Sequence, residues 1–206
     1  ITQGYPLKFL EAFANGTYTT QEAKDAIVSL QSTEGLPAVR NGMMQIGTVN
    51  DLEIFATLVN GFDRTLNGAL TADIDMSGVE NFEPIGIYSD NDGIHNNSNV
   101  NSYGGTFDGQ GHIISNLTIN TPYEAGFFSR CNKAEIKNLG LVNIHVANTD
   151  NLRAGTVAGE LISCNVSNVF VAGTIEVETT HAHCHGFAGE GSSSTVFTNC
   201  YTLHDK

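Results

Sequence analysis

The sequence has 206 residues and a formal net charge of −13, because 22 acidic residues outnumber only 9 Lys and Arg. Such dispersed basic residues exclude a nucleic-acid-binding protein, since phosphate contacts need clustered Lys and Arg, and no apolar run approaches the ~20 residues of a membrane span. A hydrophobic content of 40% excludes a disordered acidic tail. The 22 glycines and frequent asparagines predict a globular protein with many tight turns.

Residues 1–45 are predicted to form a helical N-terminal segment whose affiliation the sequence leaves open. Apolar residues recur within it at helical spacing. A further helix is predicted at about residues 49–60, with Thr48 and Asp51 at its start and a glycine stop signal at its end. We interpret this helix as a cap over one end of the β structure that follows.

From residue 65 onward the pattern changes to short strands between turns rich in Gly, Asn and Ser. Residues 70–76 alternate apolar and polar side chains, which is the period of a strand with one buried face. The polar stretch 88–103 is predicted to be a long loop. Residues 46–206, with the capping helix, are predicted to form one mainly β domain.

The second half of the chain repeats itself, with a glycine followed by an asparagine at a nearly constant distance. The repeat positions are Gly126, Gly155 and Gly186, then Asn138, Asn168 and Asn199, with Asn116 in a degenerate first copy. Short strands that recur every ~22–31 residues cannot bury their apolar faces alone, so they predict the stacked coils of a β-solenoid. We expect each asparagine to occupy a turn and to stack on its equivalents as an amide ladder, and each glycine to mark a bend.

Several segments resemble a known family in the order in which they occur. Phe107–Leu117 resembles the first coil of right-handed parallel β-helix proteins, and Leu70–Gly78 with Pro84–Gly86 looks like the start of the GLUG-motif repeat family. Gly126–Leu141 and Gly155–Val171 resemble successive GLUG repeats. The resemblance covers roughly residues 46–206.

This resemblance implies a right-handed parallel β-helix on secreted or cell-surface proteins, mostly bacterial. GLUG repeats often belong to adhesin-like or host-interacting proteins, and they accompany some metallopeptidases. The repeats themselves imply no catalytic residues. The sequence departs from the usual repeat at Phe128-Ser129-Arg130, where a small or glycine-containing turn is common.

Three acids form an alternative catalytic set, namely Asp73, Asp75 and Asp108. Paired carboxylates could serve a glycosidase, and two of these acids share one face of a predicted strand. They also belong to the ordinary start of the family's first coils. A polysaccharide lyase is disfavoured, because it needs a basic residue against the uronate and an acidic surface repels polyanions.

Two clusters could hold a cation. His181, His183 and His185 would share one face of a strand and could bind zinc or copper. Asp90 and Asp92 offer oxygen ligands to calcium, although their loop lacks the acids of an EF-hand. We favour a polar outer face and a solvated turn, and therefore expect no cofactor. The same loop, with Asp90, Asp92 and Tyr103, is a candidate ligand-contact surface.

The four cysteines are Cys131, Cys164, Cys184 and Cys200, and none lies in a CxxC pair. We predict buried free thiols, with one disulfide among the last three as the alternative.

We expect a non-catalytic, secreted or cell-surface β-helix module that acts in adhesion, display or binding of a ligand, with a host or matrix glycan or protein as partner. It would be part of a longer chain with neighbouring domains. The alternatives are a carbohydrate-active β-helix enzyme and the scaffold fragment of a larger secreted peptidase.

Overall fold

A computed structural model describes residues 36–87, 102–122, 124–148, 153–177 and 186–204. This part of the chain is mainly β, with one helix, α3 (Val49–Gly61). The strands are β1 (Val39–Arg40), β2 (Met43–Ile46), β3 (Gly68–Leu70), β4 (Ile74–Asp75), β5 (Thr106–Asp108), β6 (Ile113–Ser115), β7 (Thr118–Thr121), β8 (Phe128–Asn132), β9 (Glu135–Asn148), β10 (Ala158–Ile162), β11 (Asn165–Val177), β12 (Ala188–Gly191), β13 (Val196–Thr198) and β14 (Tyr201–His204). None of the helices described is long and apolar enough to cross a membrane.

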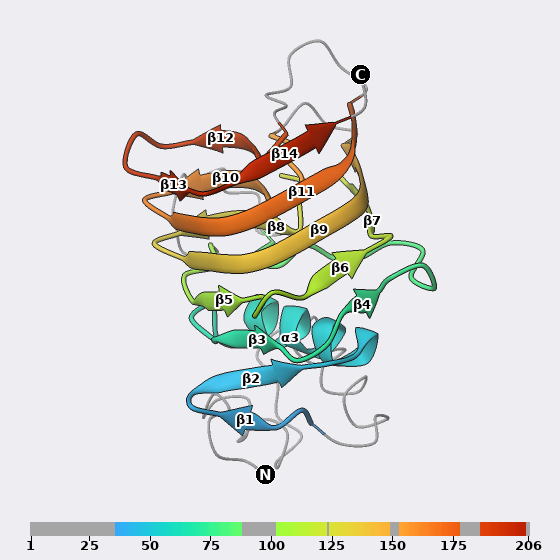
Figure 1. The fold of residues 1–206 in the computed structure, drawn as a ribbon, viewed down its shortest axis with the longest axis vertical. Coiled ribbons are helices and arrows are strands. Elements are labelled where there is room, and N and C mark those ends of the chain that lie inside the picture. The colour runs from blue at the N-terminus through green and yellow to red at the C-terminus, as the bar shows by residue number, and fades with distance from the viewer. Residues whose placement is uncertain (1–35, 88–101, 123, 149–152, 178–185, 205–206) are drawn as a thin grey trace.

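Successive turns of the chain, which we call coils, lie one above the other and pair in parallel (Figure 1). An 11-stranded sheet follows the order β1-β2-β3-β5-β9-β11-β13, and β6, β7 and β14 pair with the long strands β9 and β11. A second sheet has three strands, in the order β12-β10-β8. Each later coil therefore adds a strand to both sheets, and the two sheets enclose the core.

The core is built from columns of side chains in register between coils. One column consists of Phe107, Ile136, Val166 and Phe197, which are aligned by the pairing of β5, β9, β11 and β13. The first three are buried. A fully buried aliphatic or aromatic side chain contributes roughly 1.5–3 kcal/mol to the stability of the fold. A short strand buries such side chains only when it is stacked on its neighbours, so it is stable only within the stack.

Helix α3 fills the interior at the start of the stack. The predicted helix and its cap are confirmed, because the Asp51 amide donates to Oγ1 of Thr48 at 3.1 Å and Oδ2 of Asp51 accepts from the Thr48 amide at 3.0 Å. Phe55 points from α3 into an aromatic cluster, where its ring centroid lies 5.6 Å from that of Phe107. The helix thus supplies the apolar contents of the first coils.

The N-terminal boundary differs from the prediction of a helical segment over residues 1–45. Residues 1–35 lie outside the described part, but β1 and β2 within the remainder form an antiparallel hairpin. Asn41 and Gly42 join these strands with φ angles of 52° and 74°, as an Asn-Gly hairpin turn requires. Because β2 also pairs in parallel with β3, the sheet begins before residue 46.

Candidate functional site

An asparagine ladder runs along one corner of the 11-stranded sheet. Nδ2 of Asn199 donates to Oδ1 of Asn168 at 2.8 Å, and Nδ2 of Asn168 donates to Oδ1 of Asn138 at 2.9 Å. All three residues have φ between 53° and 54°, a left-handed conformation that asparagine tolerates better than most side chains. The recurrence of asparagine therefore has two causes, the turn and the amide column.

The ladder ends at an acid. Nδ2 of Asn138 donates to Oδ1 of Asp108 at 2.9 Å, and the same oxygen accepts from the Gln110 amide at 2.9 Å. An ionised carboxylate only accepts hydrogen bonds, so it can be the first rung of such a column but never a middle one. Asp108, a member of the alternative catalytic set, is thus the base of the ladder.

Asn116 does not belong to this ladder, although the repeat pattern aligned it with Asn138. It lies in a second one, in which Asn143 donates to Asn116 at 2.6 Å and Asn116 donates to Asp75 at 2.8 Å. The position below Asn138 is taken by Asp108 instead. The first copy of the repeat is therefore offset from the others, and both ladders begin on a carboxylate.

The third acid of the set, Asp73, also binds the coil above it. Its Oδ1 accepts from the Ile113 amide at 3.0 Å and lies 3.1 Å from Nδ1 of His112. That backbone hydrogen bond and the His112 contact lower the pKa of Asp73, while the Asn116 and Ser77 hydrogen bonds lower the pKa of Asp75. A glycosidase acid needs a raised pKa, so these two acids are shifted in the opposite direction.

The outer face of the 11-stranded sheet carries an exposed apolar column, which we call the outer apolar column. It consists of Ile113, Gly140, Phe170 and Tyr201, which lie in register on four successive coils. The exposed fractions are 40% for Ile113, 36% for Phe170 and 62% for Tyr201. Large apolar side chains that lie contiguously on a surface are typical of binding sites.

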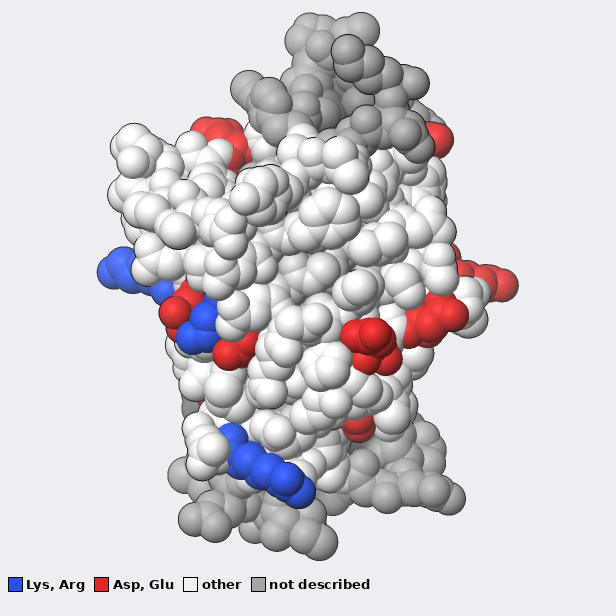
Figure 2. Space-filling model, in the orientation of Figure 1, with Lys and Arg blue, Asp and Glu red and all other residues white. Residues whose placement is uncertain are grey.

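The surroundings of this column are uncharged. The next outward-facing column adds Val142, Ala172 and the exposed Leu203. Beyond it, Nδ1 of His145 lies 3.1 Å from Oγ1 of Thr174. Figure 2 shows uncharged side chains over most of β9, β11 and β14, with the charged ones toward the lower coils and the margins. The face combines aromatic surface with hydroxyl, amide and imidazole groups.

Sequence reasoning missed the outer apolar column. Its signal is that Gly140, Phe170 and Tyr201 each lie two residues after a ladder asparagine. A side chain two residues beyond the turn faces outward in every coil once the register is known. Without the register, these residues are indistinguishable from core residues of the same type.

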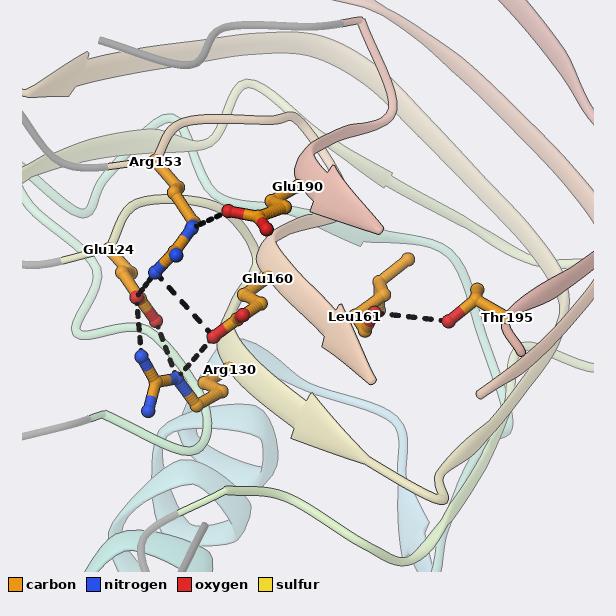
Figure 3. A network of polar contacts seen from close by, with 7 residues as sticks. All are labelled: Glu124, Arg130, Arg153, Glu160, Leu161, Glu190 and Thr195. Carbon is orange, nitrogen blue, oxygen red and sulfur yellow. Dashed lines mark hydrogen bonds and ion pairs between the residues drawn. The ribbon is translucent and has the colours of Figure 1, made fainter. Parts of the chain in front are cut away.

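A second polar cluster lies on the three-stranded sheet, where Arg130, Glu160 and Glu190 are aligned on β8, β10 and β12 (Figure 3). Arg130 contacts Glu124 through Nη2 at 2.7 Å and Glu160 through Nε at 2.7 Å. Arg153 lies 2.7 Å from Glu124 through Nη1, and it pairs with Glu190 through Nε. We call these five residues the charge network.

The charge network holds three carboxylates against two guanidinium groups. Burial raises the pKa of Glu160 in spite of its two arginine neighbours. Burial acts to lower the pKa of Arg130, but its hydrogen bond to Glu124 and the nearby carboxylates outweigh that effect and raise it. The unusual Phe128-Ser129-Arg130 segment is thereby explained, since Arg130 is the buried centre of this cluster.

The other predicted residues fall into three groups. A Cβ on Gly126 would lie 2.5 Å from the Gly155 carbonyl oxygen, and one on Gly155 would lie 2.4 Å from Cα of Ala188. Close backbone approach therefore explains these two repeat glycines. Gly186 also precedes a strand of the three-stranded sheet. Asp90, Asp92, His181, His183 and His185 lie outside the described residues.

Tyr103 is a correction, because it is not a surface ligand contact. Its side chain is fully buried, and its hydroxyl donates to the Leu66 carbonyl oxygen at 3.0 Å. Its ring stacks on Phe128 at a centroid distance of 5.2 Å, and burial raises its pKa well above the ordinary value. An aromatic residue at the end of a polar stretch thus closes the core instead of facing a ligand.

Of the four cysteines, Cys131, Cys164 and Cys200 are free, and Cys184 lies outside the described residues. Cys131 and Cys164 are buried next to one another. Burial raises the pKa of the Cys131 thiol, whereas the hydrogen bond with Cys131 lowers that of Cys164. These thiols occupy core positions, as predicted for small apolar residues.

Comparison with known proteins assigns this chain to no family. The chain matches no family model, and it matches no curated protein. A solved structure with some likeness is that of a proposed immunoglobulin A1 protease from Bacteroides ovatus, at 13% sequence identity and a TM-score of 0.44. The likeness covers 82% of this chain and 77% of the other.

Proposed function

We propose that the chain is a right-handed parallel β-helix of the GLUG-repeat type, and that it acts as a non-catalytic ligand-binding module of a secreted or cell-surface protein. The parallel, in-register pairing of successive coils in two sheets supports the fold. A right hand is expected because parallel strands joined by a crossover are right-handed in nearly all proteins.

The outer apolar column is the observation that carries the binding function. Phe170 and Tyr201 are exposed aromatic side chains at paired positions on β11 and β14, and neighbouring strands lie about 4.8 Å apart. The two side chains together offer an apolar surface against which a ring-shaped ligand can stack. Hydroxyl, amide and imidazole groups beside them can take hydrogen bonds from the same ligand. A molecule with apolar faces and hydroxyl groups at its edges, as in a saccharide, fits this combination.

The negative net charge of the chain favours a neutral glycan over a polyanionic one as the ligand. The chain carries a net charge of −13, which repels polyanionic polysaccharides over long distances. Among the described residues, the Lys and Arg side chains visible on this face lie toward its margin and the lower coils (Figure 2), whereas a uronate or sulfate needs a cationic partner beside the ring that it stacks on. Adhesion to a neutral host or matrix glycan is therefore the function that we assign to this surface.

A glycan array followed by titration tests the proposal. We expect Phe170→Ala and Tyr201→Ala each to weaken binding of the best neutral glycan at least tenfold, while Tyr201→Phe keeps the ring and most of the affinity. Glu80→Gln, a change of an exposed residue that is not a member of the outer apolar column, is the matched control. Equal binding by all variants would place the ligand elsewhere.

The enzymatic alternative is tested with the same ligand. If the purified chain cleaved a glycan and the double variant Asp75→Asn with Asp108→Asn lost that cleavage while it stayed folded, the non-catalytic assignment would be wrong. The alternative of a scaffold fragment from a larger peptidase remains a prediction.

A further inference from the structure

The second asparagine ladder ends at Asn143, although the stack of coils continues above it. Asn116 and Asn143 are its two amide rungs, and both have left-handed φ angles, of 56° and 54°. In the first ladder, Oδ1 of Asn138 and Oδ1 of Asn168 each accept from the asparagine of the coil above. Within the described part of the chain, no group donates to Oδ1 of Asn143. This acceptor is therefore left for another partner.

The second ladder ends there because β11 is one residue shorter than β9 at this corner. The pairing of the two strands shifts between Ala172 and Gly173. Ala172 lies beside Val142, but the next residue of β11 lies beside Ile144. A Cβ on Gly173 would clash with the Ile144 carbonyl oxygen, so β11 passes close to β9 here instead of bulging outward. Asn143 has no counterpart in β11, and we call the position above its side chain the missing rung.

A polar pair lies beside the missing rung. His145 and Thr174 are paired on β9 and β11, and Nδ1 of His145 lies 3.1 Å from Oγ1 of Thr174. This contact orients the imidazole and leaves its Nε2 atom for a ligand. Asn143 and Thr174 are exposed, and His145 is half-buried. An amide oxygen, a ring nitrogen and a hydroxyl group thus lie together at this corner of the outer face.

The missing rung lies along the strand from the outer apolar column. Gly140, which is paired with Phe170 in that column, precedes Asn143 by three residues, a span of about 10 Å at the rise of a strand. The outward-facing residues between them, Val142 and Ala172, are small. A single pyranose ring is shorter than this span, whereas two linked rings cover it. A sugar stacked on Phe170 therefore reaches the missing rung only through a second sugar.

We propose that the missing rung is a second subsite for the glycan, in which the sugar next to the stacked one places a hydroxyl group between Oδ1 of Asn143 and Nε2 of His145. This inference rests on the proposed function, because it takes the outer apolar column as the first subsite. A hydroxyl group can donate to the amide oxygen, as the next asparagine does in the first ladder, and also has lone pairs to accept. The ligand is then a linear, neutral oligosaccharide of at least two units that lies along the strands. Glu176, an exposed acid further along β11, disfavours an acidic sugar at this end.

The test compares sugars of increasing length on the whole chain. The probes are glucose, galactose, mannose and N-acetylglucosamine, each as the single sugar and as linear oligomers of two to four units. We expect the affinity of the best-bound sugar, measured by titration calorimetry, to rise about tenfold from one unit to two and to change little beyond two. The ring signals of His145 in NMR spectra should shift with the dimer but not with the single sugar.

Two variants assign this gain in affinity to the missing rung. Asn143→Gly keeps a residue that adopts positive φ but removes the amide oxygen, and His145→Ala removes the ring. Each should weaken binding of the dimer about fivefold and leave the affinity for the single sugar unchanged. Asn41→Gly, the same substitution at positive φ in the β1–β2 hairpin, is the matched control and should alter neither affinity.

Three results would overturn the inference. One is a dimer that binds no better than the single sugar, and another is a dimer affinity that Asn143→Gly and His145→Ala both leave unchanged. In either case, weaker binding by Phe170→Ala would leave the proposed function standing. The third is the absence of binding by every oligomer, and the glycan array then decides whether the proposed function fails as well.

Discussion

Oδ1 of Asp75 accepts a hydrogen bond from Nδ2 of Asn116 at 2.8 Å, and this contact joins two coils that are 41 residues apart in the chain. Asp73 makes a similar link two residues earlier, where it accepts from the Ile113 amide. Both acids hold the coil above them in register, so their ionisation is coupled to folding.

The stability of the chain should therefore fall as these acids are protonated. Their folded-state pKa values are lowered, so their contribution is complete above the unfolded pKa of about 3.9 and is lost as pH falls through the folded values. Urea unfolding between pH 7 and pH 3 measures it. The double variant Asp73→Asn with Asp75→Asn should show a smaller loss between pH 5 and pH 3, and an unchanged slope would contradict the link.

Removal of Glu124 should destabilise the chain strongly. Glu124 and Arg130 are both buried, and Glu124→Ala leaves two guanidinium groups with fewer carboxylates. Breaking a buried ion pair from one side costs about 3 kcal/mol or more. The control is Glu135→Ala, which breaks the more exposed pair with Lys137 and should change the free energy of unfolding by less than about 1 kcal/mol. Similar effects of both variants would show that the charge network adds little.

A methyl group at Gly155 should be poorly tolerated. In Gly155→Ala the new Cβ would lie 2.4 Å from Cα of Ala188, so β10 and β12 would have to separate. Overpacking of this kind costs about 1–3 kcal/mol. At Gly191 a Cβ meets nothing within 4 Å, which makes Gly191→Ala the matched control in thermal unfolding. Equal melting temperatures would mean that the backbone there can move apart.

Replacement of one side-chain amide of the ladder by a carboxylate should destabilise the chain. Asn168→Asp keeps a residue that tolerates positive φ, but it replaces the donor to Asn138 by an acceptor. We expect a loss of about 1–2 kcal/mol at pH 7. Part of that loss should be recovered at pH 3, because a protonated carboxyl can donate again. Asn41→Asp, in the hairpin turn, is the control, and a pH-independent effect at Asn168 would contradict the ladder.

The thiols should differ in reactivity. Cys131 and Cys164 are buried, whereas Cys200 is partly exposed. In a Cys184→Ser background we expect one thiol to react with an aromatic disulfide reagent under native conditions and two more after unfolding. Rapid reaction of three thiols in the folded chain would show that the core opens locally.

Local signals made part of this fold predictable. Thr48 and Asp51 identified the start of α3, because a capping box depends only on residues three apart. The recurrence of Asn138, Asn168 and Asn199 identified stacked coils, because each coil repeats the same turn. The hairpin at Asn41-Gly42 also had a local signal, but the helical pattern assumed for residues 1–45 concealed it.

The charge network and the outer apolar column could not be predicted, because both depend on the register between segments that are distant in the sequence. Arg130 and Glu160 meet because Cα atoms 30 residues apart are paired, and nothing in the spacing of charges along the sequence fixes that pairing. The same holds for Phe170 and Tyr201, which become one column only when β14 is placed on β11. The offset of Asn116 shows the difficulty, because a shift of five residues along the coil, from Asn138 to Asn143, moves Asn116 to another ladder.

All the hydrogen bonds of the ladders run in one direction, from the side-chain amide of one coil to the oxygen of the coil below. This direction determines where an additional coil can be inserted into the chain. Each rung at Asn138 or Asn168 both accepts from above and donates below, so a whole coil duplicated between them leaves every neighbour with the partner it had before. The rungs at Asp75 and Asp108 only accept, and they cannot be copied into the middle. Gene duplication can therefore lengthen this protein from within, while its first coils remain unique.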